Sequence, residues 1–407
     1  MSDLIARDLY VDKLHRLDSE PAAHETVRIL TGVRRSGKSS ILRLYEESLI
    51  VGGTASEQIM RVDFEKLSVT DLRDPVTFHR TVDEAVKEQS ITHLHVDEVQ
   101  ELDDWARTIN SIRATHNLHI TVTGSNASMF SGEGLTYLAG RYVTIPVYPL
   151  SLAEYQTFTD DSTGSPEELY TRWMRGTLPA VARTRDAETA ERIINDTFDS
   201  IFTRDIAMRG QLRNVESFLK VARFVFDGAG SPISPGKISN VLDSEGISVS
   251  AQSVDRFLQL LVNAHMLYQC QRYDVRGREW LRTNGKYYFV DPGLRDTLLG
   301  HRNSNTGHDL ENMVYLELLR RGYRVSTGTV QGGEIDFIAQ SSDETLYIQV
   351  ALTALDPQTL ERELRPFDKT PPGADCILIT MDRLPLQTGD VRQVNALDFL
   401  TGLPVRL

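Results

Sequence analysis

One short segment constrains the fold of this 407-residue chain more than any other. Residues 32–39 read Gly-Val-Arg-Arg-Ser-Gly-Lys-Ser, directly after the apolar run Val27–Thr31 and before an apolar-periodic helical pattern. The spacing of two glycines, a lysine and a hydroxyl residue between a strand and a helix is that of a phosphate-binding loop. Average residue frequencies give a chance match of only about 1% over a chain of this size. The segment therefore predicts a nucleotide-binding α/β domain.

Each residue type in this loop has its own chemical task. Gly32 and Gly37 let backbone N–H groups wrap a phosphate, and the start of the following helix favours negative charge. Lys38 is predicted to reach the β- and γ-phosphates, and Ser39 to hold Mg²⁺. The predicted ligands are therefore ATP and Mg²⁺. The other loop residues expected at the nucleotide are Arg34, Arg35, Ser36 and Ser40.

Polar residues also end two later strands. Asp97 and Glu98 follow the apolar run 94–96; Asp97 is predicted to contact Mg²⁺, and Glu98 to activate the attacking water as a general base. The next strand closes at residues 123–126, where Asn126 is a candidate to lie between the γ-phosphate and the water. Ordinary turn chemistry explains this tetrapeptide equally well.

Arg141 precedes the last strand of this region. Its guanidinium is a candidate to stabilise charge in the transition state, in the same chain or in a neighbouring subunit. A solvated surface arginine is the alternative, at about even odds. A homo-oligomer is therefore one possible assembly.

Composition limits the cellular setting and the partners. The formal net charge of −13 argues against a protein that coats nucleic acid, so any such contact is expected to be local. The N-terminal residues carry frequent charges, which predicts neither a signal peptide nor a membrane span. Two distant cysteines, Cys270 and Cys376, fit a reducing cytoplasm and give no zinc motif.

The pattern along the chain predicts four domains. Alternating strands and helices over residues 1–150 indicate an α/β domain with a mainly parallel sheet. Helical spacing over 151–213 favours a helical lid. Residues 214–300 read as helices followed by a two-stranded stretch, the order of a winged helix-turn-helix. Residues 301–407 return to mixed α/β.

Together these residues resemble prokaryotic AAA-type ATPases that carry a C-terminal domain of unknown function. The resemblance covers nearly the whole chain and rests on segments that include 32–40, 96–100, 123–126, 138–142, 175–181, 286–296, 311–325, 334–339 and 347–353. It implies a RecA-like P-loop ATPase core, a helical lid, a winged helix-turn-helix and a terminal domain with a PD-(D/E)XK restriction-endonuclease-like α/β fold.

The predicted winged helix contains the basic part of an acidic chain. Helices at 234–242 and 250–262 would precede a wing at 268–288, and residues 206–300 hold twelve Lys and Arg against nine Asp and Glu, a net charge of +3. Basic residues with interleaved aromatics suit a phosphate backbone. A protein-docking winged helix is the alternative, at roughly even odds. The nucleic-acid candidates are Arg272, Arg276, Arg278, Arg282 and Lys286.

The terminal domain follows the residue order of a restriction-type nuclease only in part. Glu311, Asp336 and Gln349 lie where such enzymes place their metal-binding side chains, but Gln349 replaces an acid and Ala351 replaces the lysine. A weakened metal ligand and a missing cation predict a degenerate site, retained for assembly or passive binding. Lys369 is the lysine that could substitute in space.

Three functions remain open from the sequence. The leading hypothesis is an ATP-driven switch or motor that moves the winged helix and terminal domain on nucleic acid. The second is an ATP-gated interaction or signalling module whose winged helix docks a protein partner. An ATP-dependent nuclease ranks last because of Gln349 and Ala351.

Overall fold

The computed structural model describes residues 4–127, 136–160, 164–275, 277, 279–300, 306–331 and 333–402, without the side chains of 279–284. The chain divides into two compact units. The first contains Met1–Val147 with the short segment Asn263–His265, and the second contains Tyr148–Val262 with Met266–Leu407.

A five-stranded parallel sheet forms the centre of the first unit. The strand order is β2-β3-β4-β1-β5, which confirms the predicted α/β core with a parallel sheet. Because parallel strands point the same way, the loops after β1, β3 and β4 meet at one edge of the sheet. The strands are β1 (Val27–Thr31), β2 (Ile59–Asp63), β3 (His93–Asp97), β4 (His119–Gly124) and β5 (Tyr142–Pro146).

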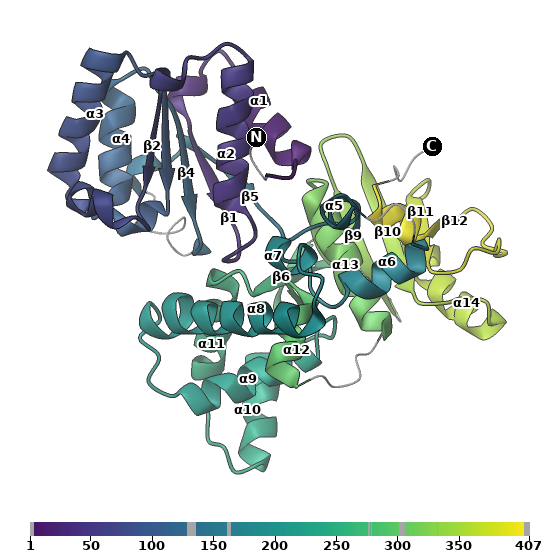
Figure 1. The fold of residues 1–407 in the computed structure, drawn as a ribbon. Helices are drawn as coiled ribbons and strands as arrows, with labels where there is room; N and C mark the ends of the chain where they lie inside the picture. The colour runs from purple at the N-terminus through teal and green to yellow at the C-terminus, as the bar shows by residue number, and fades with distance from the viewer. Residues whose placement is uncertain are drawn as a thin grey trace. The chain divides into compact units, whose positions relative to one another are not determined.

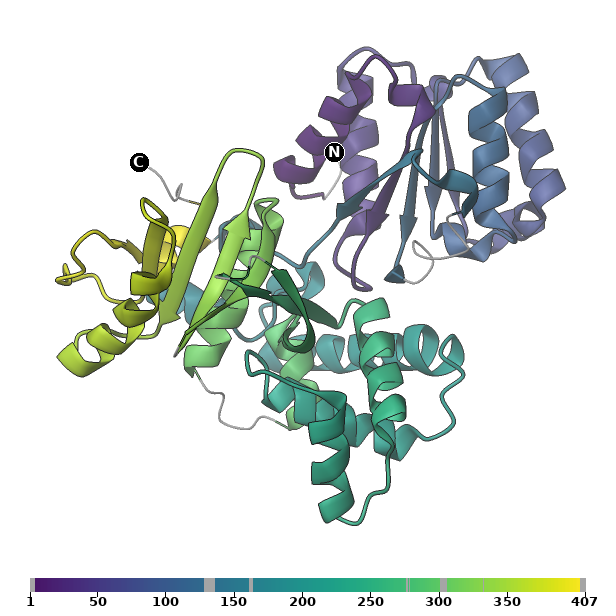
Figure 2. The same ribbon diagram turned by 180° about the vertical axis from the view of Figure 1, so that it is seen from behind.

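Helices cover both faces of this sheet, as Figures 1 and 2 show. Helices α3 (Pro75–Gln89) and α4 (Trp105–Thr115) pack on one face, where Phe78, Ile109 and Val96 join one hydrophobic core. Helices α1 (Asp8–Asp18) and α2 (Lys38–Val51) pack on the other face around a second core. Because both faces are covered, the central strands β1 and β3 are buried along their whole length.

The second unit begins with helices. They are α5 (Leu152–Thr159), α6 (Pro166–Trp173), α7 (Pro179–Ala182), α8 (Ala187–Ser200), a π-helical turn (Ile201–Met208), α9 (Val215–Asp227), α10 (Pro235–Ser244) and α11 (Ala251–Asn263). Strong amphipathic spacing in α9 buries Phe218, Val221 and Val225 on one side. Among the described residues, no helix is both long and apolar enough to cross a lipid bilayer.

A seven-stranded mixed sheet follows, in the order β12-β11-β10-β9-β8-β6-β7. The expected hairpin forms between β6 (Leu267–Asp274) and β7 (Glu279–Phe289), but β6 also pairs in parallel with β8 (Arg324–Val330). The hairpin predicted as a wing is therefore part of the sheet of the terminal segment. The four predicted domain boundaries remain predictions. The other elements are α12 (Pro292–Leu299), α13 (Thr306–Arg320), β9 (Gly333–Gln340), β10 (Thr345–Ala351), α14 (Pro357–Leu364), β11 (Asp375–Thr380), β12 (Arg392–Asn395) and α15 (Ala396–Leu400).

Candidate nucleotide site and terminal carboxylate cluster

The loop between β1 and α2 needs glycine at both ends. A Cβ on Gly32 would lie 2.2 Å from the carbonyl oxygen of Val147, so no side chain fits there. Gly37 has φ +99°, a left-handed conformation that L side chains rarely adopt. This backbone turns sharply into α2 and directs the start of that helix toward the loop. Such a helix start is suited to bind an anion.

Lys38 and Ser36 lie inside the loop. Lys38 is only 4% exposed, and its Nζ donates hydrogen bonds to the carbonyl oxygens of Gly32 (2.9 Å) and Val33 (3.0 Å). The Ser36 hydroxyl is buried and has no hydrogen-bond partner among the described residues. A buried hydroxyl without a partner costs free energy, so it fits a ligand whose oxygens accept its hydrogen bond. A nucleotide phosphate supplies such oxygens.

Asp97 lies beside the loop and gathers three polar partners. Its Oδ1 accepts hydrogen bonds from Ser39 Oγ (3.0 Å) and Thr123 Oγ1 (2.6 Å), and its Oδ2 lies 3.2 Å from Arg61 Nη2. Hydroxyl and carboxylate oxygens are typical ligands of Mg²⁺ in proteins. Ser39 and Asp97 therefore fit the predicted magnesium ligands.

Glu98 has a strained backbone, with φ 54°. A non-glycine residue persists in this conformation only where its surroundings hold it, commonly at functional sites. Its amide donates a hydrogen bond to Thr123 Oγ1 (2.9 Å), and its carboxylate accepts one from Gln100. Burial raises the pKa of Glu98, while the cations Lys38 and Arg34 oppose that rise. A raised pKa strengthens a carboxylate as a proton acceptor.

The other predicted loop and strand-end residues lie around this centre. Asn126 is 3% exposed and follows β4, which ends at the same sheet edge as β1. Arg34 is largely buried, with Nη1 3.7 Å from Glu65 Oε1. Arg35 is exposed, and Ser40 is half-buried on α2.

Arg141 lies at the opposite edge of the sheet. β5 runs parallel to β1 with Val27 beside Tyr142 and Thr31 beside Pro146, and the Arg141 carbonyl accepts a hydrogen bond from the Val27 amide. The phosphate loop follows Thr31, so a full strand of roughly 16 Å separates the two, at about 3.3 Å per residue. The expectation that Arg141 acts on the nucleotide of its own chain is therefore wrong. A role in a neighbouring subunit stays a prediction.

Several residues at the nucleotide site carried no sequence signal. Arg7 Nη1 donates to the Ser36 carbonyl oxygen (2.7 Å) from 29 positions away. Thr123, which connects Asp97 to Glu98, lies in the segment 123–126 noted in the sequence, but no role was predicted for it. His265 Nε2 lies 2.8 Å from Thr31 Oγ1, and its pKa falls to about 3 because of burial and then Lys38. Such long-range pairings leave no local pattern in the sequence.

A second polar cluster lies in the second unit. Lys286 on β7 is 3% exposed, and its Nζ contacts Glu334 (2.7 Å), Glu311 (3.1 Å) and Asp336 (3.8 Å). Tyr288 OH donates to Glu311 Oε1 (2.6 Å). Burial alone would lower the pKa of Lys286, but the three carboxylates raise it, so the ammonium stays charged. With its ammonium buried among these acids, Lys286 cannot contact a phosphate backbone, and its prediction as a nucleic-acid residue is wrong.

Gln349 joins this cluster with both ends of its amide engaged. Its Oε1 accepts from the Asp336 amide (2.7 Å), and its Nε2 lies 3.3 Å from Glu363 Oε2. Burial and Glu311 raise the pKa of Asp336, which Lys286 opposes. A cavity of about 510 Å³ opens here, and its lining includes Glu334, Gln349, Arg362, Glu363, Arg365 and Lys369. Lys369 therefore lines the cavity, whereas Lys286 is the lysine in contact with the predicted acids.

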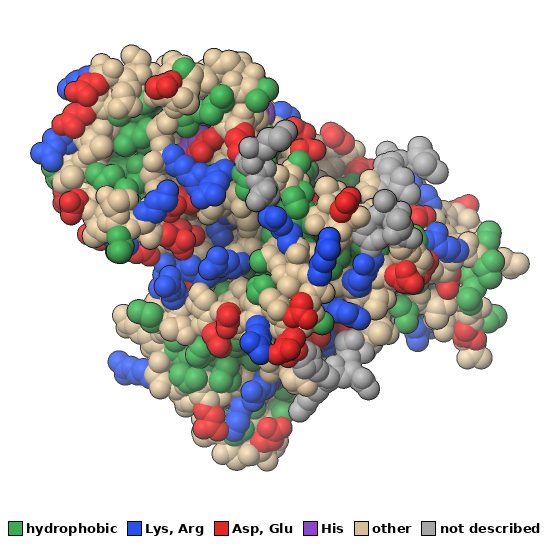
Figure 3. Space-filling model, in the orientation of Figure 1, with side chains coloured by type: hydrophobic (Ala, Val, Ile, Leu, Met, Phe, Trp, Pro, Cys, Tyr) green, Lys and Arg blue, Asp and Glu red, His purple; other side chains and the backbone are tan. Residues whose placement is uncertain are grey.

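The remaining nucleic-acid candidates are described only in part. Arg272 lies half-buried on β6, while Arg276, Arg278 and the side chain of Arg282 lie outside the described residues. On the face seen in Figure 3, both units carry acidic and basic side chains.

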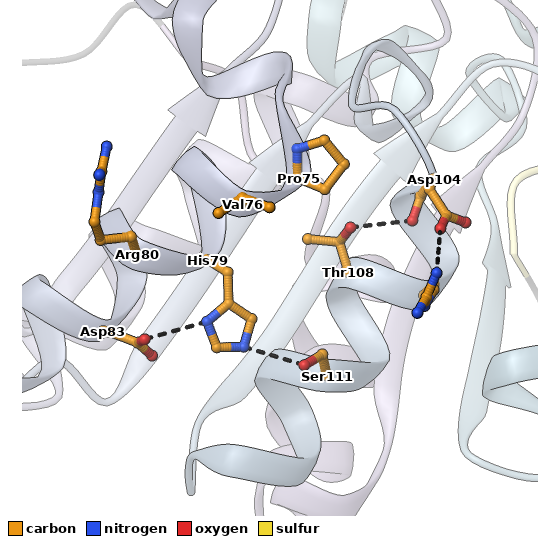
Figure 4. Close-up of a pocket in the computed structure, with 9 residues that line it drawn as sticks. Pro75, Val76, His79, Arg80, Asp83, Asp104, Thr108 and Ser111 are labelled. Atoms are coloured by element: carbon orange, nitrogen blue, oxygen red, sulfur yellow. Dashed lines mark hydrogen bonds and ion pairs between the residues drawn. The ribbon is translucent and has the colours of Figure 1, made fainter.

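A separate groove of about 460 Å³ lies between α3 and α4 (Figure 4). His79 points into it and is held between Asp83 Oδ2 (3.2 Å) and Ser111 Oγ (3.1 Å). Its lining includes both charge signs, from Arg80 and Arg107 to Asp104. None of the predicted nucleotide residues lines it.

Comparison with known proteins adds independent findings. Residues 24–156 match a family described as an AAA domain, and residues 166–305 match a domain of unknown function (DUF8612). An uncharacterized protein of Haemophilus influenzae is 38% identical over 352 residues, which cover 86% of this chain and 87% of that protein. An uncharacterized protein of Methanocaldococcus jannaschii is 24% identical over 363 residues, covering 84% and 78%.

Solved structures resemble this chain only weakly. The Aeropyrum pernix ORC1 protein in complex with DNA is 13% identical and covers 74% of this chain and 98% of that one, with a TM-score of 0.31. AMPPCP-bound DnaA from Aquifex aeolicus is 12% identical and covers 63% and 86%, with a TM-score of 0.29. TM-scores this low do not establish a common overall fold. The AAA domain match, by contrast, agrees with the phosphate loop and parallel sheet predicted from the sequence.

Proposed function

Because this chain belongs to the same family as the uncharacterized Haemophilus influenzae protein and contains an AAA domain, we propose that it is an ATPase that hydrolyses Mg-ATP. One observation carries the proposal. Ser39 and Asp97 share a hydrogen bond beside the phosphate loop, and Thr123 connects Asp97 to the strained Glu98. A predicted magnesium pair and a predicted general base are thus held by one hydrogen-bonded network.

The chemistry follows from the position of each group. The start of α2 and the Lys38 ammonium bind the β- and γ-phosphate oxygens, where negative charge is densest. Ser39 and Asp97 would hold Mg²⁺, which would supply further neutralisation of that charge. Glu98 accepts a proton from the attacking water, and its raised pKa suits this task. Asn126 is proposed to orient the same water.

Nucleotide state is proposed to control nucleic-acid binding by the second unit. Asn263–His265 belongs to the first unit, although the chain on both sides of it belongs to the second. His265 contacts Thr31, the residue before the phosphate loop. A conformational change at the phosphate loop could therefore reach α11 and β6 through the backbone on either side of His265. The alternative, docking of a protein partner by the same elements, fits the acidic remainder of the chain.

Removal of three arginines from the hairpin tests the nucleic-acid proposal. The variant Arg276→Ala/Arg278→Ala/Arg282→Ala is expected to lose most binding to duplex DNA, single strands or RNA, whichever the wild type binds. Each lost phosphate contact should reduce the slope of log K against log salt concentration by about 0.9 for duplex DNA or about 0.7 for single strands. ATP turnover without nucleic acid should stay near the wild-type value. Filter binding across a salt series measures both quantities.

A charge-matched control separates local contact from net charge. Arg107→Ala/Arg192→Ala/Arg383→Ala removes three arginine side chains that are 69%, 74% and 52% exposed elsewhere on the chain. This control should bind nucleic acid like the wild type. Equal affinity and equal salt slope in the hairpin variant and the control would favour the protein-docking alternative.

Arg141 tests whether subunits share a nucleotide site. Arg141→Ala is expected to slow ATP turnover at least about 10-fold without changing ATP affinity, because a guanidinium finger acts on charge that develops in the transition state. Its position at the far sheet edge requires that it act in a neighbouring subunit. Mixing Arg141→Ala chains with Lys38→Ala chains should then restore part of the turnover. No restoration at any protein concentration would rule out a shared site.

The terminal cluster is expected to lack nuclease activity with Mg²⁺ or Mn²⁺. Gln349 offers a neutral oxygen that already accepts a hydrogen bond from the Asp336 amide, and Lys286 separates the neighbouring acids. Both features weaken the metal binding on which such cleavage depends. A cleavage assay on duplex DNA, single strands and RNA measures this. Metal-dependent cutting that disappears in Asp336→Ala would promote the nuclease hypothesis.

A further inference from the structure

Two histidines and an aspartate meet at the amino-terminal ends of β3 and β4, away from the phosphate loop. Parallel pairing of β3 with β4 places His93 directly beside His119, and their rings stack with centroids 4.9 Å apart and planes 18° apart. Asp18 is the last residue of α1. Its Oδ1 lies 2.8 Å from His119 Nδ1, and its Oδ2 lies 3.8 Å from His93 Nε2.

The three side chains lie close enough together to share one ion. One ligand atom from each lies within 4.8 Å of the others, and within the described ranges no other group of three or more such residues does so. Asp18 Oδ2 is buried and has no hydrogen-bond partner there. Thr92 Oγ1 lies 2.9 Å from His93 Nδ1, which leaves Nε2 of that ring directed toward Asp18. A polar partner on the second ring nitrogen is the usual way in which a metal-binding histidine is oriented.

We propose that Asp18, His93 and His119 form a binding site for a divalent transition metal, with zinc as the best-fitting ion. Imidazole nitrogen and carboxylate oxygen are zinc ligands, with bonds of about 2.0–2.2 Å. Three protein ligands leave a fourth position, and His119, with 28% of its side chain exposed, gives water access to it. The site is distinct from the nucleotide centre, since His93 and His119 begin the strands whose far ends approach the phosphate loop.

The ion would fasten α1 to the sheet. Asp18 ends this helix, while Arg7 directly precedes it and donates to the carbonyl oxygen of Ser36 in the phosphate loop. A metal at Asp18 therefore stabilises α1, the helix whose N-terminal neighbour Arg7 donates a hydrogen bond to the phosphate loop. The expected role is structural, with an effect on the stability of the first unit larger than the effect on ATP chemistry.

Arg28 is the competing partner of Asp18. Its guanidinium forms an ion pair with Asp18 Oδ1 and lies 3.3 Å from His119 Nδ1. Asp18 Oδ2 has no hydrogen-bond partner among the described residues, so the carboxylate is able to bridge the arginine and the ion. If Arg28 alone satisfies Asp18, zinc will not bind, and this difference makes the proposal testable.

The chain contains a built-in control of the same composition. Asp83 Oδ2 lies 3.2 Å from His79 Nδ1, and Asp83 Oδ1 lies 2.6 Å from His116 Nε2. The ligand atoms of these three side chains do not all lie within 4.8 Å of one another, as those of Asp18, His93 and His119 do. Figure 4 shows His79 bonded instead to Asp83 and Ser111. Substitution here removes a histidine near an aspartate without touching the proposed site.

The test uses the full chain, stripped with a chelator and dialysed against zinc. Equilibrium dialysis with elemental analysis should give one zinc per chain, and zinc should raise the melting temperature. His93→Gln and His119→Gln should each weaken binding at least about 10-fold, since each removes one of three ligands. His79→Gln and His116→Gln should bind like the wild type. Asp18→Asn is the less informative variant, because it also leaves Arg28 unpaired.

Two results would overturn the proposal. One is zinc binding well below one ion per chain in the wild type, without a shift in melting temperature. The other is binding that His93→Gln and His119→Gln leave unchanged while the variants fold normally by circular dichroism. Either result would leave the cluster as an ion pair between Asp18 and Arg28.

Discussion

Glu98→Gln is expected to retain ATP affinity and to lower ATP turnover by about 100- to 10,000-fold, the usual contribution of a general base. The amide keeps the size of the side chain but cannot accept the proton of the attacking water. Lys38→Ala should act differently and lower ATP affinity by about 13- to 160-fold, since hydrogen bonds to charged groups contribute about 1.5–3 kcal/mol. Nucleotide titration and single-turnover kinetics separate the two effects.

Nearby residues provide the matched controls. Glu101→Gln changes a carboxylate that is 37% exposed and paired with Arg73, and Lys66→Ala changes an ammonium that is 60% exposed. Both should leave binding and turnover near wild type. Full turnover by the Glu98→Gln protein would show that another group activates the water.

The pH dependence of turnover gives a further check on Glu98. Burial raises its pKa, so the carboxylate becomes protonated at a higher pH than an exposed glutamate does. Because the general base must be unprotonated, turnover should fall as the pH drops through this raised pKa. The fall should be absent from the residual activity of Glu98→Gln.

Lys286→Met is expected to lower the free energy of unfolding of the second unit by about 3–5 kcal/mol, the usual cost of removing one partner from a buried ion pair. The change leaves Glu311, Glu334 and Asp336 without the ammonium that contacts them. Lys220→Met, at a lysine of α9 that is 34% exposed and paired with the exposed Glu216, should change stability by less than about 0.5 kcal/mol. Urea unfolding followed by circular dichroism measures both variants.

A second substitution distinguishes charge from packing. Glu311→Gln added to Lys286→Met should recover part of the lost stability, because it removes one of the unpaired carboxylates.

The stability that Lys286 contributes should depend on pH in one direction only. The pKa of Lys286 is raised above its ordinary 10.5, so its contribution is complete below that value and is lost as the pH rises through the raised pKa. A loss below about 1 kcal/mol in Lys286→Met would contradict this role.

Local sequence patterns predicted the parts of the molecule that local chemistry controls. The phosphate loop follows from the spacing of Gly32, Gly37 and Lys38, because backbone freedom and a helix start are properties of adjacent residues. The apolar run ending at Asp97 predicted a buried strand with an acid at its end, and the structure places Asp97 beside Ser39. The carboxyl ends of parallel strands lie at the same end of a sheet, so this proximity was expected once both strands were assigned to one parallel sheet.

The sequence also contained the signal that corrects Arg141. This residue precedes its strand instead of following it, and in a parallel sheet the two ends of a strand lie at opposite edges. The position of Arg141 before its strand, considered together with its residue type, excludes a contact with the nucleotide of the same chain.

Only the tertiary structure decided which distant residues meet. Basic spacing assigned Lys286 to a nucleic-acid surface, yet β6 pairs with β8, and Lys286 on the adjoining strand β7 is buried against acids from α13 and β9. The contacts of Arg7 with the phosphate loop, of His265 with Thr31, and of Asp18 with His93 and His119 likewise join segments far apart in the chain. The sequence by itself determined the loop, the strand-end acids and the periodicity of the elements, because these depend on neighbouring residues. Burial and long-range pairing, which set the charge partner of each ionisable group, depend on strand order and packing, and these arise only when the whole chain has folded.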